Sequence, residues 1–128
     1  MPGTSDVVCI VEDDAAVRNA LKFALEAEGL SVRIYDGPVS FLEEQSLPSF
    51  ACLVVDYRMP VMDGLELTAA LRERGMTGSV IMITGRTNKD LRARAAKLGI
   101  HHLLEKPLSD SALIDAIRNA IKAVERRA

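Results

Sequence analysis

The chain has 128 residues, of which 48% are hydrophobic and 27% charged, and its formal net charge is −2. This length fits a single domain with a sizeable core, and the mixed composition excludes a disordered or fibrous protein. No apolar stretch is long enough to span a membrane and no signal-peptide pattern is seen, so we expect a cytoplasmic protein.

Short apolar runs and amphipathic segments alternate along the chain, which predicts a parallel sheet with helices on both faces. In chain order the expected elements are a strand at residues 7–11, a helix at 15–28, a strand at 31–35, a helix at 39–44, a strand at 51–55, a helix from 64 or 65 to 73, a strand at 80–83, a helix capped by Thr87 or Asn88, a strand at 101–104 and a helix capped by Ser109 or Asp110.

Two kinds of residue in these strands could suggest chemistry. Cys9 and Cys52 lie inside two apolar strands, and we expect both to be core residues with free thiols. His101 and His102 are neighbours on the last strand, where adjacent side chains point to opposite faces. These two histidines therefore cannot bind one metal together, and we expect them at an edge or an interface.

Polar and charged side chains directly follow four of the predicted strands. They are Glu12, Asp13 and Asp14 after the first strand, Asp56 after the third, Thr84 after the fourth and Lys106 after the last. Because the carboxyl ends of parallel strands meet at one rim of the sheet, these groups should converge there. Clustered carboxylates repel one another unless a cation neutralises them, and Mg²⁺ is the hard divalent ion that usually does so. The sequence therefore predicts a Mg²⁺ site beside Asp56.

A Mg²⁺ ion held in this way can bridge to a phosphoryl group. The ammonium of Lys106 and the hydroxyl of Thr84 would then cover the remaining phosphoryl oxygens, and charge stabilisation of this kind is most of phosphoryl-transfer catalysis. Asp56 is central among these groups, and no activating base flanks it in the sequence. It is therefore predicted to be the nucleophile that forms an acyl phosphate.

The segments around these residues resemble the receiver domain of bacterial two-component response regulators. The matching segments are residues 11–14, 53–64, 83–85 and 105–107. The likeness covers nearly the whole chain and implies a flavodoxin-like (βα)₅ fold, a doubly wound parallel sheet with strand order 2-1-3-4-5. We expect the domain to occupy residues 6–126, after a flexible N-terminus at residues 1–5.

The resemblance also implies a partner and a set of metal ligands. A histidine kinase or a histidine phosphotransfer protein would donate phosphate to Asp56. Asp14 and Asp56 would bind Mg²⁺ directly, and the backbone carbonyl of Arg58 would be a further ligand. Asp13 would act mostly through bound water. Such a protein is no metabolic enzyme, because its catalysis is limited to its own phosphorylation and dephosphorylation.

One departure from the family pattern concerns the readout of phosphorylation. By the resemblance, Thr84 would sense and Lys106 would hold the phosphoryl group. Most members of the family also carry a Tyr or Phe three residues before the lysine. Leu103 stands at that position. Because leucine has no ring to turn inward, we expect the signal to leave by another route. The alternatives are movement of the loop after Thr84, the fourth helix, or His102.

Charge is distributed unevenly along the chain, with acids in excess in residues 1–66 and bases in excess in residues 67–128. The basic residues gather on the predicted fourth helix: Arg86, Lys89, Arg92, Arg94 and Lys97. A solvated helix face is one interpretation. A docking or dimer surface is the other, because in receivers the fourth helix, fifth strand and fifth helix form the output face. We expect no direct binding of nucleic acid, since the domain as a whole is acidic.

The predicted function is a phosphoacceptor switch that changes its affinity for a downstream protein, for its own output domain or for a second copy of the chain. The chain would be a single-domain regulator or, alternatively, the amino-terminal receiver of a DNA-binding transcriptional regulator. An aspartate-dependent phosphatase is the alternative from another class. It would normally need a second acid two residues after the nucleophile, and Arg58 stands there instead.

Overall fold

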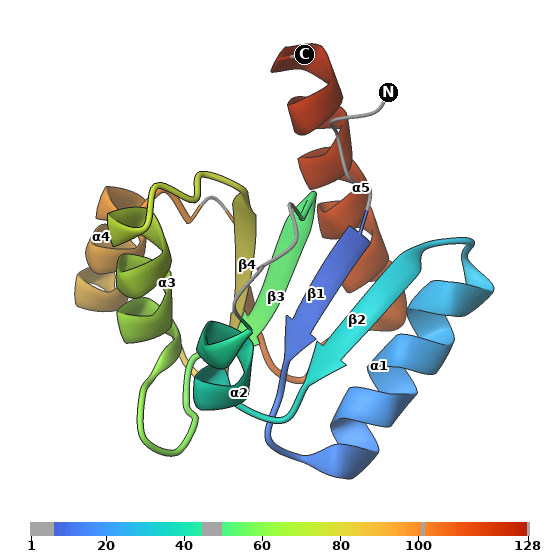
Figure 1. Ribbon diagram of the computed structural model, residues 1–128, viewed down its shortest axis with the longest axis horizontal. Helices are drawn as coiled ribbons and strands as arrows, with labels where there is room; N and C mark the ends of the chain where they lie inside the picture. Colours follow the sequence, from blue (N-terminus) through green and yellow to red (C-terminus); the bar gives the residue numbers. More distant parts are fainter. Residues whose placement is uncertain (1–6, 45–49, 101, 128) are drawn as a thin grey trace.

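The computed structural model describes residues 7–44, 50–100 and 102–127 (Figure 1). The expected flexible segment at residues 1–5 and the histidine at position 101 lie outside the described residues. Within them, strands and helices alternate strictly: β1 (Val7–Val11), α1 (Ala15–Ala27), β2 (Ser31–Tyr35), α2 (Pro38–Glu43), β3 (Cys52–Asp56), α3 (Gly64–Glu73), β4 (Ser79–Thr84), α4 (Lys89–Lys97), β5 (His102–Glu105) and α5 (Asp110–Arg127).

The strands form one parallel sheet in the order β2-β1-β3-β4-β5, which confirms the predicted topology. Helices α1 and α5 cover one face of the sheet, and α2, α3 and α4 cover the other (Figure 1). Each face has its own core cluster. Phe41, Leu67 and Leu71 pack on the α2–α3–α4 face, and Leu25 and Ile117 pack on the α1–α5 face.

The register of the sheet aligns the strand ends that carry the predicted site. On β3, Asp56 pairs with Ile83, the residue before Thr84. On β4, Thr84 pairs with Glu105, the residue before Lys106. Three strand ends therefore reach the same rim of the sheet at the same level.

Both cysteines are fully buried free thiols, as the sequence predicts. Burial raises the pKa of the Cys9 thiol to about 11. It raises the pKa of the Cys52 thiol to about 12. Because only the thiolate is a good nucleophile, both groups are packing residues and not reactive ones.

Side-chain caps start several of the helices. Asp14 Oδ1 accepts a hydrogen bond from the Val17 N–H at the start of α1, and Asn88 Oδ1 accepts one from the Leu91 N–H at the start of α4. Ser109 Oγ accepts from the Ala112 N–H at the start of α5. Each cap satisfies a backbone donor that the helix cannot use itself.

Asp63 and Glu66 form a reciprocal capping box at the start of α3. The carboxylate of Asp63 accepts from the Glu66 N–H at 2.8 Å, and the carboxylate of Glu66 accepts from the Asp63 N–H at 2.9 Å. Such a box fixes both the first turn of a helix and the direction of the chain that enters it. Asp63 therefore has a structural role at the start of α3.

The half-buried guanidinium of Arg72 connects three segments at the rim of the sheet opposite the site. It donates to the carbonyl oxygens of Leu98 at 2.8 Å, Met76 at 2.9 Å and Gly78 at 3.0 Å. Leu98 is the C-cap residue that follows α4, and Gly78 directly precedes β4. The C-terminal end of α4 is thus tied to α3 and to the start of β4.

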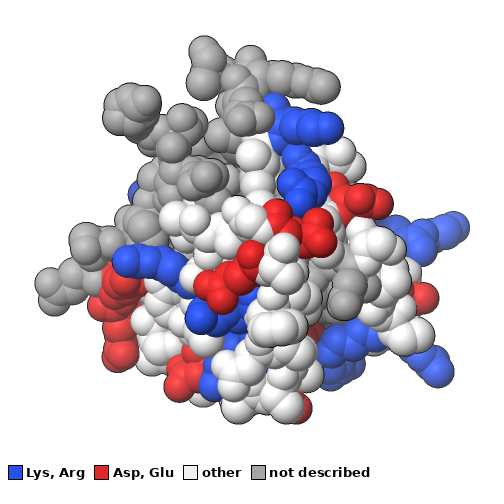
Figure 2. All heavy atoms as spheres, turned by 90° about the vertical axis from the view of Figure 1, so that its right-hand side faces the viewer, with Lys and Arg blue, Asp and Glu red and all other residues white. Residues whose placement is uncertain are grey.

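Acidic and basic side chains are intermixed on the side of the molecule that carries α1 (Figure 2). Lys22 and Glu26 form an ion pair along α1 at 3.5 Å, and Glu28 pairs with Arg118 of α5 at 3.2 Å. Exposed pairs of this kind contribute little to stability. None of the helices in the described part of the chain combines the length and the apolar character that a membrane crossing demands.

Candidate functional site

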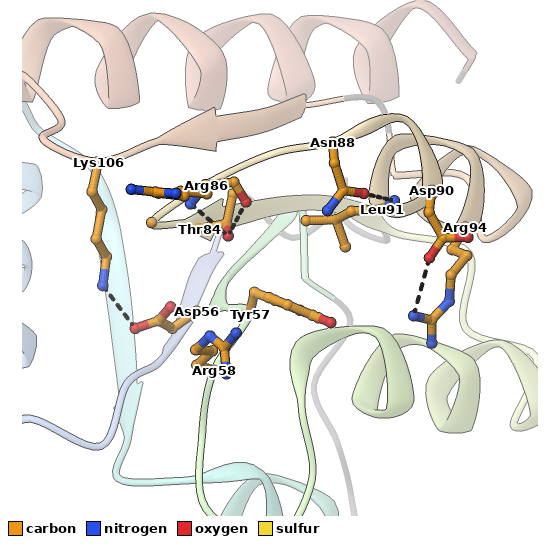
Figure 3. Close-up of a pocket in the computed structure, with 11 residues that line it drawn as sticks. Asp56, Tyr57, Arg58, Thr84, Arg86, Asn88, Asp90, Leu91, Arg94 and Lys106 are labelled. Carbon is orange, nitrogen blue, oxygen red and sulfur yellow. Dashed lines mark hydrogen bonds and ion pairs between the residues drawn. The ribbon is translucent and has the colours of Figure 1, made fainter.

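The rim of the sheet opens into a cavity of about 730 Å³ beside Asp56. Asp56, Thr84 and Lys106 all line it, so the structure brings together the three side chains predicted to take part in phosphoryl chemistry (Figure 3). The cavity extends from these residues towards the first turn of α4. It is lined by Asp56, Tyr57, Arg58, Thr84, Gly85, Arg86, Asn88, Asp90, Leu91, Arg94 and Lys106.

Lys106 and Asp56 form an ion pair across the rim. The Nζ atom of Lys106 lies 3.1 Å from Oδ2 of Asp56. The Asp56 side chain is 11% exposed and that of Lys106 is 50% exposed, so the ammonium covers the carboxylate from the solvent side. The Lys106 N–H also donates to the Thr84 carbonyl at 2.8 Å, and the peptide bond between Lys106 and Pro107 is cis.

Carboxylate oxygens of Glu12, Asp13 and Asp56 lie within 4.8 Å of one another. Glu12 is buried, and burial together with the neighbouring Asp13 and Asp56 carboxylates raises its pKa, partly offset by the hydrogen bond from the Asp14 N–H. A group of close carboxylates offers the oxygen ligands and the negative charge that Mg²⁺ requires. The residues present therefore fit a Mg²⁺ site at this position.

The carboxylates that gather beside Asp56 are those of Glu12 and Asp13. Asp14 caps α1 and is not among the carboxylates that gather at Asp56 in the described residues. Glu12, which the prediction did not include among the metal ligands, belongs to this cluster. The Glu12 N–H donates to the Tyr35 carbonyl at 3.1 Å, so the backbone pairing of β1 continues through Glu12 and turns its side chain into the site.

Thr84 is almost fully buried, and its hydroxyl is bound to the backbone of Arg86. Oγ1 donates to the Arg86 carbonyl at 2.8 Å and accepts from the Arg86 N–H at 3.3 Å. Beside it, a Cβ atom built on Gly85 would have nothing within 4 Å. The space beside Gly85 is therefore open, and a side chain at that position would not make a tight contact.

The loop after β3 packs closely against the strand end that carries Asp56. The Tyr57 N–H donates to the Ile83 carbonyl at 2.8 Å, and the Gly64 N–H donates to the Tyr57 carbonyl at 2.8 Å. A Cβ atom on Gly64 would lie 3.0 Å from the Asp56 carbonyl oxygen. A side chain at this position would therefore force its neighbours to shift by a few tenths of an ångström, and glycine avoids this.

Leu103, where the family resemblance leads one to expect an aromatic ring, is half-buried on β5 and pairs with Met82 of β4. It lines a second cavity, of about 290 Å³, together with Arg92, Ala95 and Ile100. Empty space therefore lies between α4 and β5 beside this leucine. His102, the neighbouring residue, is also half-buried.

The fold and the acidic rim together define a flavodoxin-like α/β domain whose ligand site lies at the carboxyl ends of its strands. Residues 8–118 match the family model of the response regulator receiver domain. The chain therefore belongs to the response regulator receiver family, whose members are signalling phosphoacceptors and not metabolic enzymes.

Among curated proteins, the chain is 35% identical to the transcriptional regulatory protein FixJ of Bradyrhizobium diazoefficiens over 122 residues, which are 95% of this chain and 60% of FixJ. It is 40% identical to FixJ of Azorhizobium caulinodans over 114 residues, 89% of this chain and 54% of that protein. The chain thus spans between 54% and 60% of the length of these two relatives.

Solved structures agree with this assignment. The crystal structure of FixJ-N superposes with a TM-score of 0.82 at 32% identity and covers 94% of this chain and 96% of that one. A CheY-like receiver domain protein from Methanospirillum hungatei superposes with a TM-score of 0.89 at 24% identity, covering 98% and 100% of the two chains, and shows the fold alone.

Proposed function

We propose that Asp56 accepts a phosphoryl group from a histidine kinase or a histidine phosphotransfer protein and that the phosphorylated domain changes its affinity for a partner. The position of the Asp56 carboxylate carries this proposal. It is nearly buried, it belongs to the acidic cluster with Glu12 and Asp13, and it lies 3.1 Å from the Lys106 ammonium at a cavity that admits a phosphodonor. Membership of the response regulator family itself implies a histidine kinase as partner.

In the phosphoryl transfer, an oxygen of Asp56 attacks phosphorus and the bond from phosphorus to the donor histidine nitrogen breaks. The imidazole leaves with the electron pair of that bond. Lys106 holds one phosphoryl oxygen by its ammonium, and the Thr84 hydroxyl donates to another. Such fixed charges and donors are the main source of catalysis in this reaction.

We propose that Mg²⁺ is held by the carboxylates of Glu12, Asp13 and Asp56, with the backbone carbonyl of Arg58 as a further ligand. The clustering of the three carboxylates supports this set, in which Glu12 takes the place predicted for Asp14. When bound, the ion neutralises the charge that builds up on the phosphoryl oxygens. Asp14 keeps its role as the cap of α1.

We propose that the output surface is formed by α4, β5 and α5 and that the signal reaches it through the loop between β4 and α4. Two contacts of Thr87 in this loop support the route. Its N–H donates to the Glu105 carboxylate at 2.9 Å, and its hydroxyl accepts from the Arg92 guanidinium at 2.9 Å. Movement of Thr84 is thereby transmitted to α4 and to the end of β5 without an aromatic ring at Leu103. The surface would bind a downstream protein, an output domain or a second copy of the chain.

The FixJ proteins that the chain resembles are transcriptional regulators, and the chain corresponds to about half to three fifths of their length. We therefore propose that this receiver controls transcription through an output domain. A single-domain regulator is the second candidate, and the fold of the receiver serves both. Reading the coding sequence beyond Ala128 distinguishes them.

Incubation with Mg²⁺ and a small acyl phosphate, followed by intact-mass spectrometry, tests the phosphoacceptor function. The wild-type protein should gain one phosphoryl group per chain, and Asp56→Asn should gain none. Omission of Mg²⁺ should abolish labelling. Rapid multiple turnover of the donor without a stable modified protein would contradict the proposal and favour the phosphatase.

A further inference from the structure

Arg86 lines the site but has no part in the phosphoryl transfer proposed above. It follows Thr84 by two positions and lines the cavity beside Asp56. Figure 3 shows its side chain extending along the cavity towards Lys106, on the side of Asp56 that Lys106 also occupies. Arg86 is exposed and forms no ion pair within the part of the chain that the structure describes.

The other guanidinium groups of the cavity have partners. Arg58 lies over the Tyr57 ring, with its central carbon 5.9 Å from the ring centroid. Arg94 lies 3.8 Å from the Asp90 carboxylate. Arg86 is therefore the guanidinium of this cavity that can bind a new anion without losing an existing contact of its side chain.

The backbone of Arg86 is coupled to the phosphoryl site through Thr84. The Thr84 hydroxyl has a single proton, which it now donates to the Arg86 carbonyl at 2.8 Å. A phosphoryl oxygen can receive this proton only if the bond to the Arg86 carbonyl breaks. Engagement of Thr84 with the phosphoryl group therefore breaks the shorter of the two hydrogen bonds that hold the backbone of Arg86.

The charges at the phosphorylated site also favour a further cation besides Mg²⁺ and Lys106. Phosphorylation replaces the carboxylate of Asp56 by a group with about two negative charges and three acceptor oxygens. Lys106 is a single point charge and its side chain is half exposed. A guanidinium presents two parallel donors that match phosphoryl oxygens, and the cavity of about 730 Å³ is large enough for it to approach.

We propose that Arg86 is a further phosphoryl-binding residue. When Thr84 turns from the Arg86 carbonyl to a phosphoryl oxygen, the loop after β4 is released, and the Arg86 guanidinium donates to a phosphoryl oxygen that Lys106 leaves uncovered. The two movements reinforce each other, because the first frees the residue that makes the second contact. This inference rests on the phosphorylation of Asp56 proposed above.

Binding of beryllium trifluoride, a phosphoryl analogue, measured by calorimetry with saturating Mg²⁺, tests the role of Arg86. Arg86→Gln should weaken binding about tenfold, because it removes a charge-assisted hydrogen bond. Arg86→Lys keeps the charge but loses the forked donors, and its loss should be smaller. The matched control is Lys89→Gln, which removes one exposed charge from α4 outside the cavity lining and should change the affinity less than about twofold.

Fluorine NMR of the bound analogue separates a direct contact from a structural one. Arg86→Gln should shift the resonance of the fluoride nearest the guanidinium, and Lys89→Gln should leave the spectrum unchanged. Equal affinity losses in the two variants, or an unchanged fluorine spectrum in Arg86→Gln, would overturn the inference. If the wild-type protein failed to bind the analogue, or if Asp56→Asn bound it equally well, the proposed function itself would fail.

Discussion

The Lys106 ammonium and the Asp56 carboxylate face each other at 3.1 Å, and the same carboxylate lies within 4.8 Å of those of Glu12 and Asp13. Lys106 and a divalent cation therefore neutralise the same group of carboxylates. Two cations that serve one acidic cluster also repel each other. The protein must balance the affinity for Mg²⁺ against the charge that will hold the phosphoryl group.

We expect Lys106→Met to bind Mg²⁺ about threefold more tightly than the wild-type protein, because the competing charge is gone. Calorimetric titration with MgCl₂ at fixed ionic strength measures the change. Lys97→Met, an exposed lysine at the end of α4, is the control and should leave the affinity unchanged. Weaker binding in Lys106→Met would show that the ammonium supports the metal site.

The choice between Glu12 and Asp14 as a metal-site residue can be decided by charge removal. Glu12→Gln and Asp13→Asn should each weaken Mg²⁺ binding about tenfold, because each removes a carboxylate from the cluster. Asp14→Asn should retain the affinity within about twofold, since asparagine caps a helix as well as aspartate does. A loss in Asp14→Asn as large as that in Asp13→Asn would restore Asp14 to the ligand set.

Gly64 permits the close contact between α3 and the end of β3. A Cβ atom there would lie 3.0 Å from both the Asp56 carbonyl oxygen and the Met82 sulfur. We expect Gly64→Ala to lower the free energy of unfolding by about 1–3 kcal/mol, because backbone must move. Gly85→Ala, where the added Cβ meets nothing within 4 Å, should change it by less than about 0.5 kcal/mol. Urea denaturation of both variants provides the test, and equal stabilities would contradict the steric argument.

Val61 has a backbone φ of 75°, in the left-handed region that β-branched residues avoid, and its side chain is 86% exposed. Its side chain therefore offsets little of the strain. Val61→Asn should raise the free energy of unfolding by about 1 kcal/mol, since asparagine tolerates this conformation. The control is Val39→Asn, an exposed valine of α2 outside that region, which should bring no gain. Thermal denaturation that ranked the two variants in the opposite order would show that Val61 is held there by its contacts.

The buried thiols predict a loss of stability at alkaline pH. The fold raises the pKa of Cys9 from 9.0 to about 11 and that of Cys52 from 9.0 to about 12. The native state holds the thiol protons more tightly than the unfolded chain does. The contribution of the protonated thiols to stability is therefore complete below the unfolded pKa of 9.0 and is lost as the pH rises through the native pKa values.

We therefore expect the wild-type protein to lose more stability between about pH 8 and about pH 10 than a Cys9→Ala/Cys52→Ala variant does. Urea midpoints at the two pH values measure the difference, and the variant corrects for the lysines and tyrosines that titrate in both proteins. Parallel pH profiles would mean that the thiols are not protected by burial.

Much of this fold could be predicted from local patterns in the sequence. The predicted strands at residues 7–11 and 31–35 coincide with β1 and β2, and the predicted caps Asn88 and Ser109 start α4 and α5. These features depend on short-range rules of burial and capping, which the sequence carries directly. The strand order was an implication of the family resemblance, because pairing between distant strands leaves no local mark.

The orientation of the acids after β1 could not be predicted in the same way. Glu12, Asp13 and Asp14 are chemically similar, and which of them faces Asp56 depends on where the strand stops. The backbone bond from Glu12 to Tyr35 extends the pairing of β1 with β2 by one residue, and the residue at which this pairing stops has no mark in the local sequence. The hydrogen bonds between Thr84 and Arg86 belong to loop geometry and were equally hidden.

The three carbonyl contacts of Arg72 limit how α4 can move. The contact with Leu98 holds the C-terminal end of the helix, and the contacts with Met76 and Gly78 hold the half-buried Arg72 side chain in place. The near end is held at Thr87 by the exposed side chains of Glu105 and Arg92, which exchange easily with water. A displacement that starts in the loop after β4 should therefore rotate α4 about its C-terminal end at Leu98, so that its first turn moves farthest. A partner that distinguishes the two states would gain most by contacting that first turn.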